Sequence, residues 1–128
     1  MENYRRLQVS GKARSLAVFV YRVTAAFPRE EQFGMTMQMR KAANGIGLTI
    51  AEGCGRGTTP DLIRFLYMAN GSAQELEFAA ELSLDLQFAS NSDLEAVMAR
   101  AVEIQKMLRA LIAGLKRRNS TRRPGSSS

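Results

Sequence analysis

A chain of 128 residues with no histidine and a single cysteine, Cys54, excludes several classes of chemistry before any element is placed. It can form no intramolecular disulfide, no cysteine and histidine zinc site within one chain, and no Ser-His-Asp or Cys-His pair. Its net charge of +6 favours a polyanionic partner. The length fits one domain.

No arrangement of carboxylates or lysines indicates an active site, so we expect a non-enzymatic protein without a metal or cofactor. A carboxylate-based enzyme stays open, and two facing carboxylates in a water-filled pocket would indicate it. No apolar run approaches the roughly 18 residues of a membrane span. The start, MENYRR, lacks the layout of a secretory signal. We therefore expect a cytoplasmic protein with no membrane partner.

The first predicted helix covers residues 9–26 and ends before Phe27-Pro28. Its buried stripe is expected at Val9, Ala13, Leu16, Val20, Val23 and Phe27. Val18, Phe19 and Tyr21 are also apolar but lie off that stripe. A helix that is apolar most of the way round is usually buried on more than one side. It either sits centrally in the domain or faces another subunit, and we favour the subunit.

The second predicted helix covers residues 35–53, with a buried stripe at Met39, Ala43, Ile46 and Ile50. Small residues lie beside the stripe, including two mid-helix glycines, Gly45 and Gly47. Glycine at mid-helix costs about 1 kcal/mol relative to alanine. These glycines therefore predict the close approach of a neighbouring helix. Gly53 is predicted as the left-handed C-cap.

Residues 53–57, Gly-Cys-Gly-Arg-Gly, resemble a phosphate-binding loop only superficially. No strand precedes them and the Gly-Lys-Ser/Thr ending of a P-loop is missing. A flexible connection between two helices is the favoured interpretation. Arg56, beside the start of the next helix, remains a candidate for meeting an anion there.

The third predicted helix covers residues 60–88, with Thr59 as N-cap and Pro60 in the first turn. Its expected core positions are Leu62, Leu66, Ala69, Ala73, Leu76 and Ala80. The small segment 69–73 is predicted to pack tightly against the second helix. Glu77, Glu81 and Asp85 are predicted on its outer face, as either a solvated surface or a dock for a basic face of another subunit.

The fourth predicted helix covers residues 93–116, with Ser92 and Glu95 as a capping box. Its apolar positions are Leu94, Val97, Met98, Ala101, Ile104, Leu108, Leu111, Ile112 and Leu115. Residues 1–117 form the bundle, and residues 118–128 are predicted to be a disordered basic, serine-rich tail. That tail provides either phosphate contacts or a solubilising end.

Charge is distributed unevenly along the chain. Residues 1–64 carry a net charge of +5, residues 65–115 a net charge of −4, and residues 116–128 a net charge of +5. Four amphipathic helices with short connections indicate an all-α fold, an antiparallel up-down-up-down bundle.

The sequence also resembles the four-helix-bundle proteins encoded in intervening sequences of bacterial 23S rRNA genes, from about residue 4 to residue 116. The matching pieces include Phe27-Pro28, Ala42-Ala43, Ile50-Ala51-Glu52-Gly53 and Ala69-x-Gly71-Ser72-Ala73-x-Glu75-Leu76-Glu77. The chain departs from the family pattern at Thr49, usually asparagine, at Lys41, usually arginine, and at Asn44, usually serine.

The resemblance implies a homopentameric ring linked to ribosomal RNA, with no defined enzymatic activity. The apolar residues outside the buried stripe of the first helix and the uneven charge distribution along the chain agree with an oligomer. A head-to-tail ring needs two different complementary faces on each subunit. Similar bundles are accessory proteins of diversity-generating retroelements, where a basic pentamer associates with a reverse transcriptase and its RNA or DNA. A protein-binding scaffold without nucleic acid is a further alternative.

We predict binding of RNA or DNA, RNA foremost, through phosphates. The candidate phosphate contacts are Arg5, Arg6, Lys12, Arg14, Arg40, Lys41, Arg56, Lys116, Arg117, Arg118, Arg122 and Arg123. The candidates for structural ion pairs or an oligomer interface are Val18, Phe19, Tyr21, Glu31, Glu52, Glu75 and Glu77.

Overall fold

The structure is a computed structural model that describes residues 3–4 and 7–121. Over these residues the chain has four long helices, one short 3-10 helix and no strand. The elements are α1 (Gln8–Thr24), the 3-10 helix η2 (Arg29–Glu31), α2 (Met35–Cys54), α3 (Thr59–Asp85) and α4 (Asn91–Thr121). The predicted all-α fold with four helices is confirmed.

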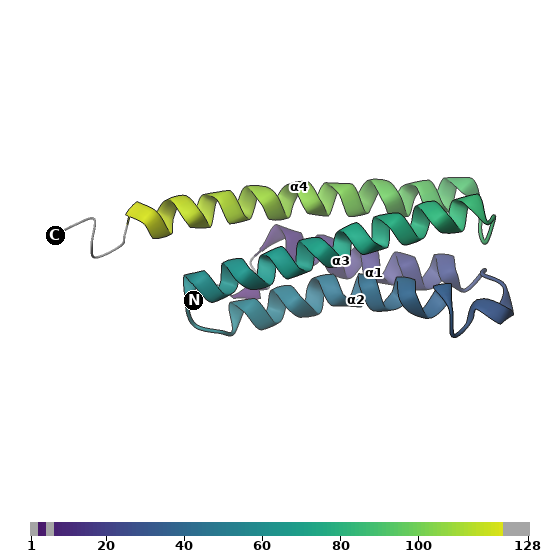
Figure 1. The fold of residues 1–128 in the computed structure, drawn as a ribbon, viewed down its shortest axis with the longest axis horizontal. Coiled ribbons are helices and arrows are strands. Elements are labelled where there is room, and N and C mark those ends of the chain that lie inside the picture. Colours follow the sequence, from purple (N-terminus) through teal and green to yellow (C-terminus); the bar gives the residue numbers. More distant parts are fainter. Residues whose placement is uncertain (1–2, 5–6, 122–128) are drawn as a thin grey trace.

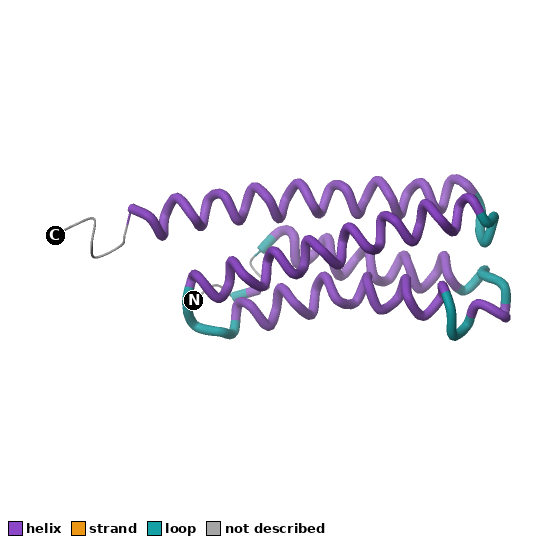
Figure 2. Tube along the Cα trace, viewed as in Figure 1, coloured by secondary structure: helices purple, strands orange, loops and turns teal. Residues whose placement is uncertain are grey.

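The four long helices lie along one axis, and each runs opposite to the next (Figure 1). Helix α3 packs most extensively, on α2 and α4, whereas α1 has thinner contacts with α2 and α4. Short loops join the helices at the two ends of the bundle (Figure 2). We call the end with the α2–α3 loop and the last turns of α4 the terminal end. The opposite end, with η2 and the α3–α4 connection, is the turn end.

One stripe of each helix supplies the core. All predicted stripe positions of the first three helices are buried: Val9, Ala13, Leu16, Val20, Val23 and Phe27; Met39, Ala43, Ile46 and Ile50; Leu62, Leu66, Ala69, Ala73, Leu76 and Ala80. In α4, seven of the nine predicted positions are buried, and only Met98 and Leu111 are partly exposed. The stripes are correct because apolar side chains at a 3.6-residue period share one helix face.

Small residues bring α2 and α3 close together, as predicted. A Cβ atom added to Gly45 would lie 3.0 Å from the Ser72 Oγ atom. One added to Gly53 would lie only 2.6 Å from the Phe65 Cβ atom. Gly53 is therefore a buried packing position inside α2, and its prediction as a left-handed C-cap is wrong. The left-handed glycine of this loop is Gly57, with φ of 94°.

Both predicted N-caps are displaced along the chain. The cap of α3 is Thr58, whose side chain accepts a hydrogen bond from the Asp61 amide at 3.3 Å, and not Thr59. At the start of α4, the Asp93 amide donates to Ser90 Oγ at 3.2 Å, so the predicted Ser92 capping box is wrong. A side-chain hydroxyl caps the helix at both N-termini, but the geometry of the preceding loop determines which residue supplies it.

Three helix ends also differ from prediction. Helix α1 stops at Thr24, where the Thr24 hydroxyl donates to the Val20 carbonyl at 2.7 Å. Helix α3 stops at Asp85, because Gln87 takes a φ of 59° and the Phe88 amide returns to the Ser83 carbonyl. Helix α4 continues to Thr121, so the first residues of the predicted tail are helical. The rest of that tail, residues 122–128, lies outside the described residues.

The turn end is closed by an aromatic pair and a side-chain cap. The rings of Phe27 and Phe88 have centroids 5.4 Å apart, with Phe27 in the core and Phe88 packed against it. Glu31 Oε1 accepts a hydrogen bond from the Met35 amide at 3.0 Å. This carboxylate therefore satisfies one of the free N–H groups at the start of α2.

Candidate nucleic-acid and subunit interfaces

The twelve basic residues predicted as phosphate contacts do not gather on one face. Four of them, Arg5, Arg6, Arg122 and Arg123, lie outside the described residues. The other eight lie on α1, α2, the α2–α3 loop and the last turns of α4. Their surroundings separate those that are bound within the chain from those that face outward.

Arg40 joins α2 to the end of α1. Its Nε atom donates to Thr24 Oγ1 at 2.8 Å, and its Nη2 atom donates to the Tyr21 carbonyl at 3.3 Å. The guanidinium also lies 4.6 Å from the centroid of the Tyr21 ring. The Asn44 side chain adds a hydrogen bond to the Tyr21 hydroxyl at 2.8 Å. Arg40 thus has a packing role between two helices, and its role as a phosphate contact stays a prediction.

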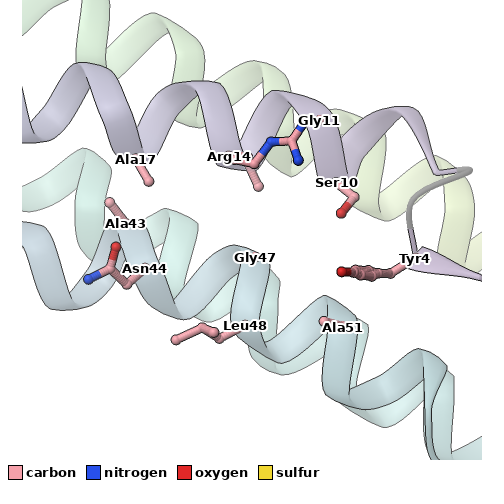
Figure 3. A pocket seen from close by; sticks show the side chains of 11 residues that line it. Tyr4, Ser10, Gly11, Arg14, Ala17, Ala43, Asn44, Gly47, Leu48 and Ala51 are labelled. Atoms are coloured by element: carbon pink, nitrogen blue, oxygen red, sulfur yellow. The ribbon is translucent and has the colours of Figure 1, made fainter.

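The two basic candidates on α1 lie on different sides of the helix. Lys12 Nζ is 3.4 Å from Glu103 Oε2 on α4. Arg14 lines a groove of about 490 Å³ between α1 and α2 (Figure 3). The groove exists because Ala17, Gly47 and Ala51 leave little side-chain volume between the two helices.

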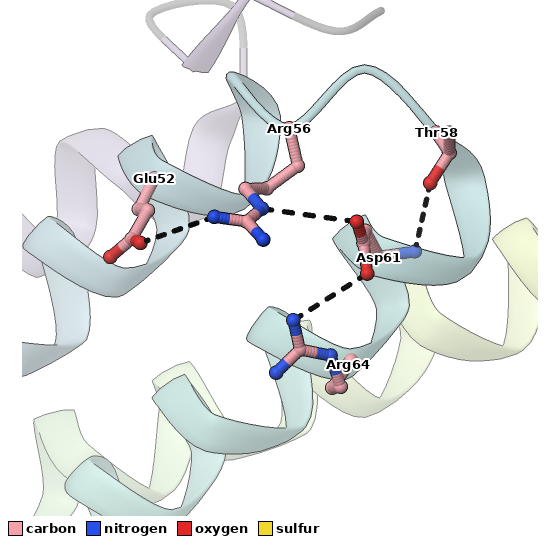
Figure 4. A network of polar contacts seen from close by, with 5 residues as sticks. All are labelled: Glu52, Arg56, Thr58, Asp61 and Arg64. Carbon is pink, nitrogen blue, oxygen red and sulfur yellow. Dashed lines mark hydrogen bonds and ion pairs between the residues drawn. The ribbon is translucent and has the colours of Figure 1, made fainter.

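Arg56 belongs to a polar network at the terminal end (Figure 4). Its Nη1 atom is 3.9 Å from Glu52 Oε2, and its Nε atom is 3.8 Å from Asp61 Oδ2. Arg64 Nη2 lies 3.5 Å from Asp61 Oδ1. Both guanidinium groups lie over the Phe65 ring, at 5.3 Å for Arg56 and 4.7 Å for Arg64. Two arginines face two carboxylates here, so the charges of this network balance.

The last turns of α4 carry Lys116, Arg117 and Arg118, all exposed. Lys116 Nζ donates to the Tyr67 hydroxyl on α3 at 2.6 Å. Beyond Glu103, sequence reasoning missed two further exposed cations on this helix, Lys106 and Arg109. They were not selected from the sequence because they lie in residues 65–115, a segment whose net charge is negative. The signal that could have found them is that no acid follows Glu103 in the chain.

Folding converts the charge pattern of the sequence into a separation along the bundle axis. The turn end carries Glu81 and Asp85 from α3 and Asp93 and Glu95 from α4, all exposed. The cations of the α4 C-terminus lie at the opposite, terminal end (Figure 1). The bundle is therefore acidic at one end and basic at the other.

The predicted interface residues take several positions. Val18 and Tyr21 are 48% and 42% exposed, which agrees with a second apolar side of α1. Phe19 is partly covered by Arg100, whose guanidinium lies 4.6 Å from the ring centroid. Glu77 does not belong to an outer acidic face, because its Oε1 atom accepts from Gln105 Nε2 on α4 at 2.9 Å. The acids Glu31 and Glu52 are held locally as described above, whereas Glu75 is exposed on α3.

Two faces of the bundle expose large apolar side chains. The first apolar face consists of Val18, Tyr21, Phe33, Met37 and Leu48, on α1, α2 and the connection between them. The second apolar face consists of Met68 and Phe78 on α3. Leu48 is 70% exposed and Phe78 is 65% exposed, so most of each apolar side chain faces solvent. Along the described part of α4 no large apolar side chain is exposed.

Hollows border both faces. Leu48 and Asn44 line the α1–α2 groove and also a second hollow that reaches Phe33 and Met37. A third hollow lies between α2 and α3 and is lined by Lys41, Glu75 and Phe78, among others. Sequence reasoning missed Leu48 and Phe78. Both occupy apolar positions off the buried stripe, which is the signal that identified Val18 and Tyr21.

Among the described residues, no group of three or more histidine, cysteine, aspartate or glutamate side chains is arranged to hold a metal ion. No helix in the described part of the chain has the length and apolar character needed to cross a membrane.

Comparison with known proteins links this architecture to a family. A family model described as 23S rRNA-intervening sequence protein matches residues 5–110. No curated protein sequence matches the chain. A crystal structure of a Bacteroides thetaiotaomicron protein of unknown function, from the S23 ribosomal protein family, superposes with a TM-score of 0.73 and 25% sequence identity. The match covers 81% of this chain and 97% of that one. The family model spans most of the sequence, and the chain therefore belongs to the 23S rRNA-intervening sequence protein family.

Proposed function

We propose that this protein is a non-enzymatic, cytoplasmic, homo-oligomeric protein that binds nucleic acid, RNA foremost, through phosphates. The observation that carries the proposal is the basic terminal end, where the last turns of α4 expose Lys116, Arg117 and Arg118. Phosphates are attracted by such an excess of arginine and lysine whatever the base sequence. Family membership supports a link to ribosomal RNA.

The assembly in this proposal is a closed ring of five copies, as the family resemblance implies. A head-to-tail ring needs two different faces that fit each other. The first and second apolar faces differ in position, and their charges are complementary. Arg14 lies beside the first face and Glu75 lies beside Phe78 on the second, whereas Lys41 borders hollows at both faces. Contact between these faces would cover side chains that a single bundle leaves in water.

Binding should be tested by titrating RNA and DNA at several salt concentrations with the full chain and with a variant that ends at Leu115. We expect the full chain to bind at low salt and to lose affinity steeply as salt rises. The shorter variant lacks five cations. Its slope of log K against log salt should fall by up to about 3.5, at about 0.7 for each contact to a single strand. Failure of the full chain to bind either nucleic acid at low salt would refute the nucleic-acid function.

The assembly should be tested with Leu48→Glu, because Leu48 is 70% exposed and its replacement should leave each bundle folded. We expect light scattering to report a smaller particle for this variant than for the wild type. The matched control is Ala99→Glu, which places the same charge on the exposed side of α4. If Leu48→Glu keeps the wild-type mass, the first apolar face is not a subunit contact.

A protein partner is the second candidate function, favoured by the exposure of Phe33, Leu48 and Phe78. A reverse transcriptase of a diversity-generating retroelement is the partner that the family resemblance suggests. A full chain that is monomeric and binds no nucleic acid would favour this alternative, because its apolar faces would still lack an occupant.

A further inference from the structure

The exposed surface of α4 beyond Glu103 carries basic side chains and no acidic one. No acid follows Glu103 in the sequence, and Lys106, Arg109 and Arg117 are all exposed. Within the part of the chain that the structure describes, none of these three takes part in an ion pair. Their charges are therefore available to a ligand, unlike those of Lys12 or Arg56.

A half-exposed tyrosine lies among these cations. Tyr67 on α3 is 51% exposed, and its hydroxyl accepts the hydrogen bond from Lys116. The Lys116 ammonium lies 5.0 Å from the centroid of the ring. This contact shows which side of α4 faces α3. Arg109 precedes Lys116 by seven residues, which is about two helical turns, so it lies on the same side.

We call the surface formed by Tyr67, Arg109 and Lys116, together with Lys106 and Arg117 on the adjoining outer side of α4, the α3–α4 seam. At a rise of about 1.5 Å per residue, its cations extend over about 16 Å of α4. Two acidic residues lie at the edge of the seam near the middle of the bundle, and each has a partner within the chain. Gln105 donates to Glu77 at 2.9 Å, and Lys12 lies 3.4 Å from Glu103.

The α3–α4 seam is separate from the proposed subunit contacts. The first apolar face lies on α1, α2 and their connection, and the hollow beside the second face lies between α2 and α3. Within its described residues α4 exposes no large apolar side chain. Assembly through the two apolar faces would therefore leave the α4 cations of the seam open to solvent.

We propose that the α3–α4 seam binds single-stranded nucleic acid, with phosphates on the α4 cations and a base stacked on the Tyr67 ring. This inference rests on the proposed function and specifies its ligand. Proteins usually bind single strands with a row of cations along the nucleic-acid backbone and an exposed aromatic ring on which a base stacks. A duplex offers phosphates to the same cations, but its bases are stacked on one another and cannot use the ring.

The position of the site is tested by a matched pair of charge variants. Lys106→Gln combined with Arg109→Gln removes two cations from the seam. Arg22→Gln combined with Arg29→Gln removes two exposed cations from the turn end. The probe is a short single-stranded RNA, titrated at several salt concentrations. The seam variant should reduce the salt slope by about 1.4, at about 0.7 for each contact, and the control should leave it unchanged. Equal reductions in both variants would overturn the placement.

The stacking contact is tested by comparing Tyr67→Leu with Tyr67→Phe on the single strand and on a duplex of the same sequence. Loss of the ring should weaken single-strand binding about tenfold and leave duplex binding unchanged, because one stacked base contributes at about this level. Tyr67→Phe keeps the ring and should bind the single strand like the wild type. Unchanged single-strand affinity in Tyr67→Leu would overturn the stacking contact.

These results separate the inference from the proposed function. If the wild-type chain binds no RNA at low salt, the proposed function itself fails. If it binds RNA but both charge variants behave alike, the function stands and the α3–α4 seam is wrong. Circular dichroism of each variant shows that the bundle is intact, as expected for changes at exposed positions.

Discussion

Replacing Leu66 by alanine should lower the free energy of unfolding by about 2–5 kcal/mol. Leu66 is fully buried in α3, the helix that packs on both α2 and α4. The substitution removes apolar contacts and leaves a cavity that the surrounding helices fill only in part, because interiors are close-packed. Urea denaturation followed by circular dichroism measures the change.

The matched control for Leu66→Ala is Leu48→Ala, which removes the same atoms from a side chain that is 70% exposed. Its effect on the unfolding of one bundle should stay within about 0.5 kcal/mol. Both variants must be compared with the wild type at one protein concentration, since self-association adds to apparent stability. Similar losses in the two variants would contradict the assignment of Leu66 to the core and Leu48 to the surface.

Gly53→Ala should destabilise the bundle by about 1–3 kcal/mol, even though alanine is the better helix former. The new Cβ atom would lie 2.6 Å from the Phe65 Cβ atom and 3.3 Å from Leu62 Cδ1. A Cβ atom cannot rotate away, so α2 and α3 must move apart and lose contacts along their shared surface. The loss is measured as a lower midpoint in thermal or urea unfolding.

Gly114→Ala is the control for Gly53→Ala. It also lies inside a helix, but its new Cβ atom would meet only Arg117 Nη2 at 3.8 Å, which is ordinary contact. This variant should gain up to about 1 kcal/mol from helix propensity alone. A gain of similar size in Gly53→Ala would show that α2 and α3 do not approach closely at this point.

The sequence by itself determined the four helices and the residues that they bury. The stripes of α1, α2 and α3 follow from helical periodicity, a local property that any amphipathic helix carries. Pairing of the small segments of α2 and α3 was also predictable, because the mid-helix Gly45 carries a cost that its close approach to Ser72 explains. Gly47, the other mid-helix glycine, faces Ala13 on α1 instead. Residues whose roles depend on their immediate neighbours in the chain could therefore be predicted from the sequence.

Only the tertiary structure decided the role of residues whose partners lie far along the chain. Gly53 looked like a helix cap, yet it lies inside α2, where Phe65 on the next helix leaves no room for a side chain. Glu77 looked like part of an acidic outer face, yet it is bonded by Gln105. Lys106 and Arg109 lie in a segment of negative net charge. They belong to a surface that includes Tyr67 only because α4 packs antiparallel to α3, which brings Lys116 to Tyr67. Local periodicity specifies which side of a helix is buried, whereas the approach of other helices decides what each remaining side chain meets.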